Sequence, residues 1–270
     1  MDRLIVLGTG AAGAIHYYNT CFLLEGPEGR LLVDGGGGNL ILRQLKQAGV
    51  GLEELTDVFV SHEHIDHCLG VIWVIRFSSH MYARGMKTKP LRIHCHADLA
   101  EKLLTICQLT LGEKQCRPIG KDILFCPVSD GEKRDIVGHE VTFFDMQSTK
   151  AEQYGFRMVS PDGQSIVFTG DEPCPPCCEN YLDGADWMMH EAFCLDSDSE
   201  IYHPHAIGHG TVKEAAELAR RHGVANLVMW HTEDSRTVGT RKERYTAEAE
   251  ETFSGGVYVP DDMEVINLRG

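Results

Sequence analysis

The sequence predicts a mixed α/β domain in which helices cover the faces of β-sheets. Three observations support this class: apolar runs of strand length recur along the chain, helical segments separate several of them, and glycine-rich turns mark the boundaries. With 270 residues the chain can bury a large core. No linker or repeat interrupts it, so we expect one domain over residues 1–270.

In the first half, strands and turns alternate before the first helix. The expected strands are residues 4–7, 21–24, 30–33, 58–60 and 91–94. A glycine run at 35–38 opens the helix expected at 40–48, and further helical segments are expected from 72–77 and near 99–109. The glycine run lacks the Lys-Ser/Thr of a P-loop, so we expect it to let the backbone pass close to the histidine cluster at 62–67.

The second half repeats the alternation. Apolar runs predict strands at residues 141–144, 156–159, 166–168, 187–189 and 227–230, and an alanine-rich segment predicts a helix at 212–221. Only two strands and a turn fit between residues 148 and 170.

Charge and composition narrow the function classes. The formal net charge is −15 and the basic stretches at 84–89 and 241–244 are short, which disfavours a large folded nucleic acid as partner. The absence of a leader or a twenty-residue apolar span leads us to expect a soluble, cytoplasmic protein that contacts no membrane. The ten scattered cysteines are typical of reduced thiols.

The segment 61–67 is the most informative stretch, because four of its residues are metal-ligand types: His62, His64, Asp66 and His67. On extended backbone His62 and His64 point the same way, while Asp66 and His67 fall in the turn beyond. This arrangement suits two adjacent divalent metals, since imidazole and carboxylate are their common ligands.

Two later residues extend this set of candidates. Asp171 follows Gly170 at the end of the strand expected at 166–168, and His231 follows the strand expected at 227–230. Each is a weak signal alone, because an aspartate after a strand commonly caps a turn. Together they give the order His-x-His-x-Asp-His, then Asp, then His.

That order resembles the metallo-β-lactamase fold superfamily, in particular its ribonuclease Z-like branch. The blocks Leu-Gly-Thr-Gly-Ala-Ala at 7–12, Leu-Val-Asp-Gly at 32–35, Asp-Trp-Met-Met-His-Glu-Ala at 186–192 and His-Gly-Thr at 209–211 carry the resemblance. It spans about residues 4–231. It implies an αββα sandwich, two mixed β-sheets flanked by helices, with metals at one edge between the sheets.

The resemblance also implies a role for each candidate. Two divalent metals, zinc or manganese, would be held as follows: the first by His62 and His64, the second by Asp66, His67 and His231, with Asp171 bridging them. Asp34 would support the histidines from behind. Glu191 would orient His209, which would protonate the leaving oxygen, and Asp66 joins them in the expected catalytic set.

One position departs from the family pattern. A further histidine ligand of the first metal is expected after the strand at 141–144, and Gln147 stands there instead. An amide oxygen is a weaker donor for zinc than imidazole. We therefore expect a first site that is weak, empty or filled by a harder metal such as manganese.

The expected activity is metal-assisted hydrolysis of a phosphodiester by a metal-activated water. The short 148–170 segment lacks the basic arm of relatives that trim tRNA, so a small phosphodiester or a short single-stranded nucleic acid is the expected substrate. The resemblance implies a homodimer. Two alternatives stay open: a degenerate, non-catalytic metal- or nucleotide-binding relative, and an oxidoreductase that uses iron in the same pocket.

Overall fold

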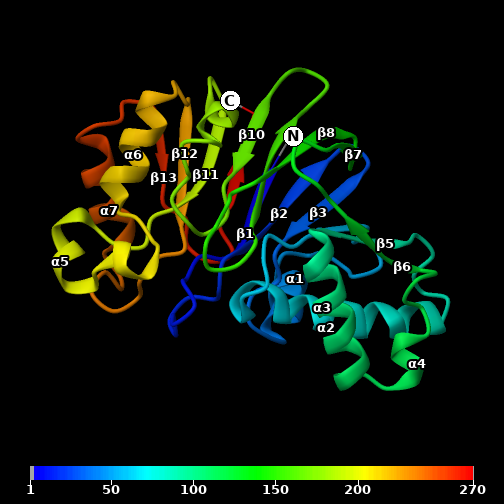
Figure 1. Cartoon of the computed structure of the whole chain (residues 1–270). Helices are drawn as coiled ribbons and strands as arrows, with labels where there is room; N and C mark the ends of the chain where they lie inside the picture. The colour runs from blue at the N-terminus through cyan, green and yellow to red at the C-terminus, as the bar shows by residue number, and fades with distance from the viewer. Residues whose placement is uncertain (1–2, 270) are drawn as a thin grey trace.

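The computed structural model describes residues 3–269, which form two β-sheets of seven strands each (Figure 1). The first sheet has the order β14-β1-β2-β3-β4-β5-β6 and the second the order β13-β12-β11-β10-β9-β8-β7. The strands of the first sheet are β1 (Arg3–Gly8), β2 (Cys21–Gly26), β3 (Gly29–Val33), β4 (Asp57–Phe59), β5 (Leu91–Cys95), β6 (Ile123–Pro127) and β14 (Val265–Asn267). Those of the second are β7 (Lys133–Ile136), β8 (His139–Asp145), β9 (Tyr154–Val159), β10 (Ser165–Phe168), β11 (Trp187–Glu191), β12 (Asn226–Trp230) and β13 (Gly256–Tyr258).

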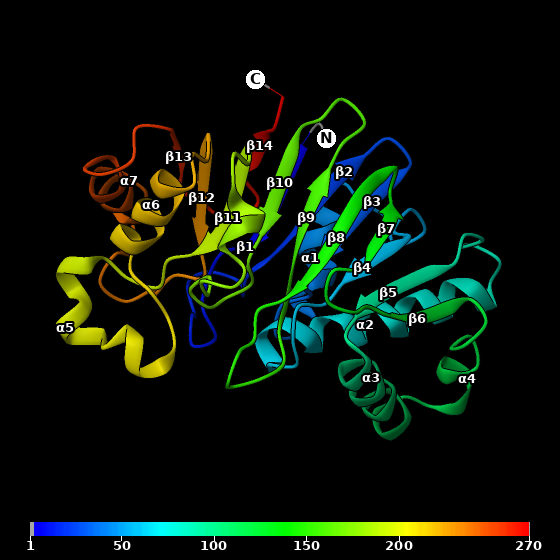
Figure 2. The same ribbon diagram turned by 45° about the horizontal axis from the view of Figure 1, so that its top comes forward.

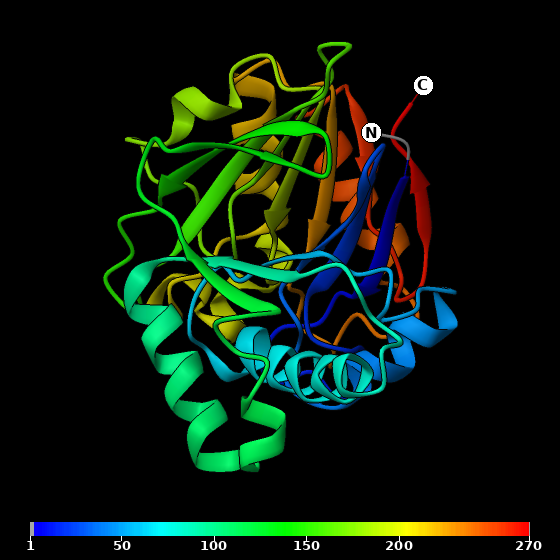
Figure 3. The ribbon, with the colours of Figure 1, turned by 90° about the vertical axis from the view of Figure 1, so that its right-hand side faces the viewer.

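Helices cover the outer face of each sheet (Figures 1 and 2). On the first sheet they are α1 (Leu40–Gln47), α2 (Ile65–Ala83), α3 (Ala97–Thr110) and α4 (Glu113–Cys116). On the second they are α6 (Val212–Arg221) and α7 (Arg241–Glu250). The short α5 (Ser199–Tyr202) lies away from the strands in the segment before α6 (Figure 1), and 3₁₀ turns occur at Glu179–Leu182, Asp196–Asp198 and Pro204–Ile207. Figure 3 shows the cyan α2 and green α3 outside the strands. The expected αββα sandwich is therefore confirmed.

Alternation along the strands builds three apolar layers. On β1, Leu4 and Val6 face the core between the sheets, whereas Ile5 and Leu7 face the helices of the first sheet. Phe22, Phe59 and their neighbours fill the inter-sheet core, and a third cluster lies beneath α6 and α7. This two-sided burial follows from the period of two along a strand, and it explains why the strands read as nearly continuous apolar runs.

Parallel pairing fixes where the strand ends meet. β3, β4, β5 and β6 run parallel in the first sheet, and β10, β11, β12 and β13 run parallel in the second. The carboxyl ends of parallel neighbours share one edge, so the loops after them are brought together. Polar residues after these strands are placed side by side, although they lie far apart in the sequence.

The glycine run lets the first helices approach the sheet closely. The amide of Gly35 donates to His67 O at 2.8 Å, and that of Gly70 donates to Gly36 O at 2.7 Å. A Cβ on Gly70 would lie 1.8 Å from Gly35 O, so a larger side chain there would push α2 away from the loop. The expectation of a close backbone approach at this run is confirmed.

Most of the expected elements are present, with altered ends. The largest difference is α2, which begins at Ile65 rather than near residue 72. Strands β6, β7, β13 and β14 and the helices α4, α5 and α7 were not expected from the sequence. No helix within residues 3–269 is long and apolar enough to cross a membrane.

Candidate metal centre

The first-sheet side of the centre is the segment between β4 and α2. His62 and His64 lie on the extended loop after β4, and Asp66 and His67 lie in the first turn of α2. The expected turn beyond the histidines is thus a helix start. Successive side chains on a helix are rotated by about 100°, so Asp66 and His67 leave the helix in different directions. Nε2 of His67 faces the carboxylates of Asp66 and Asp171.

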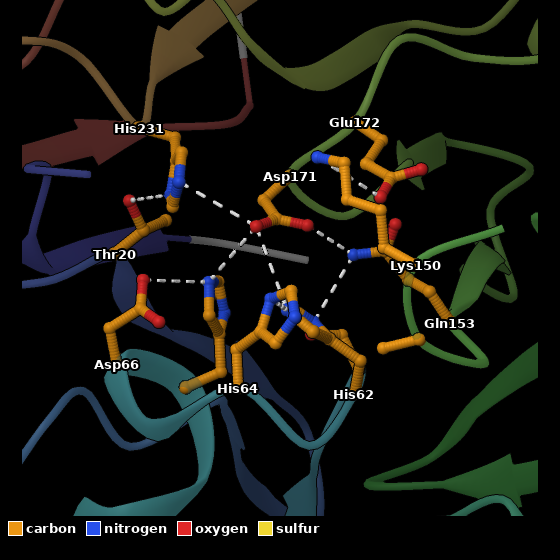
Figure 4. Close-up of polar contacts among 12 residues, drawn as sticks. Thr20, His62, His64, Asp66, Lys150, Gln153, Asp171, Glu172 and His231 are labelled. Atoms are coloured by element: carbon orange, nitrogen blue, oxygen red, sulfur yellow. Dashed lines mark hydrogen bonds and ion pairs between the residues drawn. The ribbon is translucent and has the colours of Figure 1, made fainter. Parts of the chain in front are cut away.

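The second-sheet side comes from the ends of parallel strands. Asp171 follows β10, Glu191 ends β11 and His231 follows β12 with a left-handed φ of 55°. Figure 4 shows Asp171 at the middle of the cluster, between His231 and the histidines of the first-sheet side. Residues more than 160 positions apart, such as His62 and His231, therefore contribute to one site.

Asp171 is the hub of this cluster. Its Oδ2 lies 3.6 Å from Nε2 of His62, 3.5 Å from Nε2 of His67 and 3.6 Å from Nε2 of His231. Oδ2 of Asp66 lies 3.3 Å from Nε2 of His67. Two sets of three donors have their ligand atoms within 4.8 Å of one another, namely His62–His67–Asp171 and Asp66–His67–His231.

The donors fit a divalent cation. Asp34 Oδ2 lies 2.8 Å from Nδ1 of His67, which fixes the proton on that nitrogen and leaves Nε2 directed into the cluster. Nε2 of His67 is buried and has no hydrogen-bond partner, although carboxylate oxygens of Asp66 and Asp171 surround it. This imidazole nitrogen and the two buried carboxylates around it make a donor set for zinc, manganese or a similar ion, which would replace the proton of the ring.

The pKa values of the buried histidines and of Asp171 are shifted by the charges around them. Burial opposes the protonation of His67, but Asp34, Asp171 and Asp66 outweigh it and hold the pKa well above its usual value. Burial would raise the pKa of Asp171, but His62, His67 and His231 outweigh it and hold that pKa well below its usual range. At His62 and His231 burial prevails and lowers the pKa to about 3, so both rings are neutral.

Asp34 lies behind the histidines, where the resemblance placed it. Its Oδ1 accepts from the amide of Ser61 at 2.8 Å, and its Oδ2 accepts from Oγ of Ser61 at 2.8 Å. Asp34 has a left-handed φ of 55°, and it is fully buried with His67. Such a carboxylate fixes the ring orientation of a ligand histidine.

Gln147 does not reach the centre, which corrects the expectation for this residue. Gln147 is exposed and has a φ of 52°, and its backbone N–H donates to Oδ1 of Asp145. The loop between β8 and β9 spans residues 146–153. Its last residue, the buried Gln153, reaches the cluster in place of Gln147. Nε2 of Gln153 lies 3.2 Å from Nδ1 of His62 and donates to Oδ1 of Asp171 (Figure 4).

Gln153 was missed because spacing alone favoured the residue next to the strand. The available signal was the pair of glutamines on one loop, of which Gln153 stands two residues before Gly155. Thr20 was missed too; its Oγ1 lies 3.3 Å from Nδ1 of His231.

His209 lies beside the cluster, held differently from the expectation. Its Nδ1 lies 2.9 Å from the backbone oxygen of Asp171, whereas Oε2 of Glu191 is 3.8 Å away. Glu191 is fully buried and accepts from the amides of Gly210 at 2.6 Å and Phe193 at 3.1 Å. Glu191 therefore shapes the loop around His209 rather than bonding its ring.

The position of His209 makes it available for proton transfer. Its ring stacks on Phe193 with centroids 5.2 Å apart and lies 5.2 Å from the ring of His231. Because Nδ1 is occupied by the Asp171 carbonyl, Nε2 is the nitrogen left to exchange a proton with a bound molecule.

Comparison with known sequences finds one family profile and several curated relatives that match most of the chain. The sequence profile described as anti-Pycsar protein Apyc1 matches residues 2–218. A ribonuclease Z of Bradyrhizobium sp. is 25% identical over 86% of this chain and 89% of its own length. A ribonuclease Z of Nocardia farcinica is 26% identical over 98% of this chain and 97% of its own.

Solved structures show the same fold. The metallo-β-lactamase fold protein YhfI of Bacillus subtilis matches with a TM-score of 0.79 and 21% identity, covering 98% of this chain and 99% of its own. The short form of human tRNase Z matches with a TM-score of 0.74 and 19% identity, covering 99% and 100%. Zinc-bound PqqB of Methylobacterium extorquens gives 0.71 at 13% identity, covering 98% and 99%.

Proposed function

The chain belongs to the family described as anti-Pycsar protein Apyc1, with the metallo-β-lactamase fold, and on this basis we propose that it is a metal-dependent phosphodiesterase. The proposed substrate is a small phosphodiester or a short single-stranded nucleic acid. The curated relatives named ribonuclease Z support the bond type, because a ribonuclease cleaves phosphodiester bonds.

The observation that carries this proposal is the free Nε2 of His209 beside the donor cluster. A divalent cation on these donors, zinc or manganese, would polarise a phosphoryl group and lower the pKa of the attacking water. His209 in its imidazolium form would give the proton on Nε2 to the leaving oxygen and keep the Nδ1 proton on the Asp171 carbonyl. Asp66 faces the same cluster from beside His67, and we assign it the acceptance of a proton from the water.

The loops around the site support a small substrate. β9 and β10 follow each other with only a short turn between them, so no arm projects from this part of the chain. Burial lowers the pKa of His209, and the nearby positive charge of Lys150 lowers it further. The net charge of −15 repels a large polyanion such as structured tRNA more than it repels a compact anion. The homodimer implied by the resemblance stays a prediction.

The test is hydrolysis of a substrate panel by protein loaded with zinc or manganese. The panel contains bis(p-nitrophenyl) phosphate, a cyclic mononucleotide, a short single-stranded RNA, a tRNA precursor and a β-lactam. We expect turnover of the small diesters or the short RNA, and little with the tRNA precursor or the lactam. His209→Ala should lower kcat by about 10²- to 10⁴-fold, as expected for loss of a general acid, with unchanged metal content.

A protein that binds metal but turns over no diester would contradict this proposal. It would favour the non-catalytic metal- or nucleotide-binding alternative. Oxygen-dependent turnover by iron-containing protein would instead favour the oxidoreductase.

A further inference from the structure

Gln153 is a buried amide at the heart of the metal centre, with only 1% of its surface exposed. Its Nε2 donates to Oδ1 of Asp171 and lies 3.2 Å from Nδ1 of His62. Its Oε1 is buried without a hydrogen-bond partner. The amide N–H of Gln153, which carries a partial positive charge, therefore points at Oδ1 of Asp171. The other oxygen, Oδ2, faces His62, His67 and His231.

His64 stands apart from the convergent donors. Both sets of three donors described above contain His67, and neither contains His64, which is only half-buried. Nδ1 of His64 instead lies 2.9 Å from Nε2 of His62. A hydrogen bond between the two rings places a proton on one of these nitrogens and occupies the lone pair of the other, so neither nitrogen is offered to a cation.

The two observations reinforce each other. Nδ1 of His62 lies 3.2 Å from Nε2 of Gln153 and 3.0 Å from Oγ of Ser61. In the tautomer in which Gln153 is the donor to Nδ1, the ring proton of His62 is on Nε2, where it can bond His64. The network is complete without a cation between His62 and His64. An amide N–H supplies Asp171 with a donor where a cation would otherwise supply charge.

We propose that the centre retains one tightly bound metal ion, on Asp66, His67, Asp171 and His231, and that Gln153 takes the part of a cation at the first position. This proposal rests on the proposed function for the presence of a metal, and it specifies how many ions the chain keeps. Two carboxylates and two imidazoles balance the charge of a divalent ion and give it four donors. Gln153 is thus a positioning residue that holds Asp171 and His62.

The test is metal content per chain after zinc or manganese loading and exhaustive dialysis, measured by elemental analysis. The wild-type chain should retain one equivalent. Gln153→His should retain two, because an imidazole restores a donor between His62 and Asp171. Gln147→His is the matched control: the same exchange on the same loop, at an exposed position, should leave one equivalent.

A third variant separates positioning from ligation. Gln153→Ala should keep one equivalent with about 10- to 100-fold weaker affinity, as found for groups that orient metal ligands. Two equivalents in the wild-type chain, falling to one in Gln153→Ala, would overturn the proposal and make Oε1 of Gln153 a ligand.

A measurement on the wild-type chain alone covers the case in which Gln153→His does not fold. Titration of the metal-free chain with Co²⁺ should bring its visible absorbance to a plateau at one equivalent, and a plateau at two would refute the single-ion centre. These readouts are independent of activity. A chain that keeps one ion but hydrolyses no diester would overturn the proposed function and leave this inference standing.

Discussion

Asp57 is a fully buried carboxylate on β4, away from the candidate ligands. Its Oδ2 accepts from Nη2 of Arg92 at 2.7 Å, and its Oδ1 lies 2.8 Å from Nε of Arg92 and 2.9 Å from Nε2 of His94. His94 therefore has a structural role, as a partner of this buried carboxylate. Removing the Arg92 or His94 side chain would leave the buried carboxylate of Asp57 without one of its partners.

The pKa of Asp57 predicts an acid-sensitive term in stability. Burial alone would raise this pKa, but the bonds from His94 and Arg92 outweigh it and lower the value from 3.8 to about 2. Because the folded pKa lies below the unfolded one, the stabilisation is full above pH 4 and is lost as pH falls through about 2. The shift corresponds to about 2 kcal/mol.

The measurement is urea unfolding of the wild type and Asp57→Asn between pH 2 and pH 6. We expect the variant to be less stable at pH 6 and the difference to shrink toward pH 2. Glu200→Gln, at an exposed position, is the control and should follow the wild type. An unchanged difference across this range would argue that Asp57 contributes nothing through its charge.

We expect the substitution Glu191→Gln to lower both the stability and the activity of the chain. Its two oxygens accept backbone N–H groups of Gly210 and Phe193, and a glutamine has only one acceptor oxygen. Glu191→Gln should therefore cost about 1–3 kcal/mol of unfolding free energy. Displacement of the neighbouring His209 should lower kcat by about 100-fold. Denaturant unfolding and steady-state kinetics measure the two effects, and an unchanged kcat would show that Glu191 does not position His209.

At the scale of elements, the site depends on a contact between two loops. Lys150, after β8, donates to the carbonyl of Ile207 at 2.5 Å and lies 3.4 Å from Oε1 of Glu172. It packs against Gly208, directly before His209. The loop that carries His209 is thus tied to the loop that carries Gln153.

Gly208→Ala should break this contact. Gly208 has a φ of 73°, and a Cβ there would lie 2.0 Å from Cε of Lys150. Gly223→Ala is the matched control, because φ is 63° and nothing lies within 4 Å of the added Cβ. Both substitutions should lower stability by about 1 kcal/mol through the left-handed backbone. Only Gly208→Ala should also lower kcat, as steady-state kinetics with thermal unfolding would show.

For the whole molecule, the centre joins the two sheets. Asp66 and His67 come from the first-sheet side, and Asp171 and His231 follow strands of the second. A cation held by both sides would bind the folded chain far better than the unfolded one. It would also offset the repulsion among Asp34, Asp66 and Asp171.

Chelation should therefore lower the melting temperature of the whole chain. At a metal concentration 1,000 times Kd, bound metal contributes about 4 kcal/mol, and EDTA removes that term. Calorimetry before and after EDTA, with metal added back, measures it. His231→Ala should melt near the chelated wild type and respond less to EDTA. A melting temperature insensitive to EDTA would contradict a metal that links the two sheets.

The sequence predicted the layers because each strand is a short apolar run and burial on both faces leaves such runs uninterrupted. It missed β6 and β7, whose residues are partly exposed, and β13 and β14, which are only three residues long. It placed the start of α2 too late, because Asp66 and His67 interrupt the apolar pattern of the first turn. Edge strands and polar helix starts carry little periodic signal.

The sequence by itself determined the mixed α/β class and the candidate donors, because apolar periodicity and ligand-type residues are local properties of the chain. The αββα arrangement was implied by the resemblance of its motifs to the metallo-β-lactamase fold superfamily. The tertiary structure alone decided that Gln153 rather than Gln147 enters the centre, and that Asp171 holds His209 through its backbone oxygen. Both depend on how far a loop extends before it returns to the sheet. That path is set by packing against residues distant in sequence, which spacing along the chain does not encode.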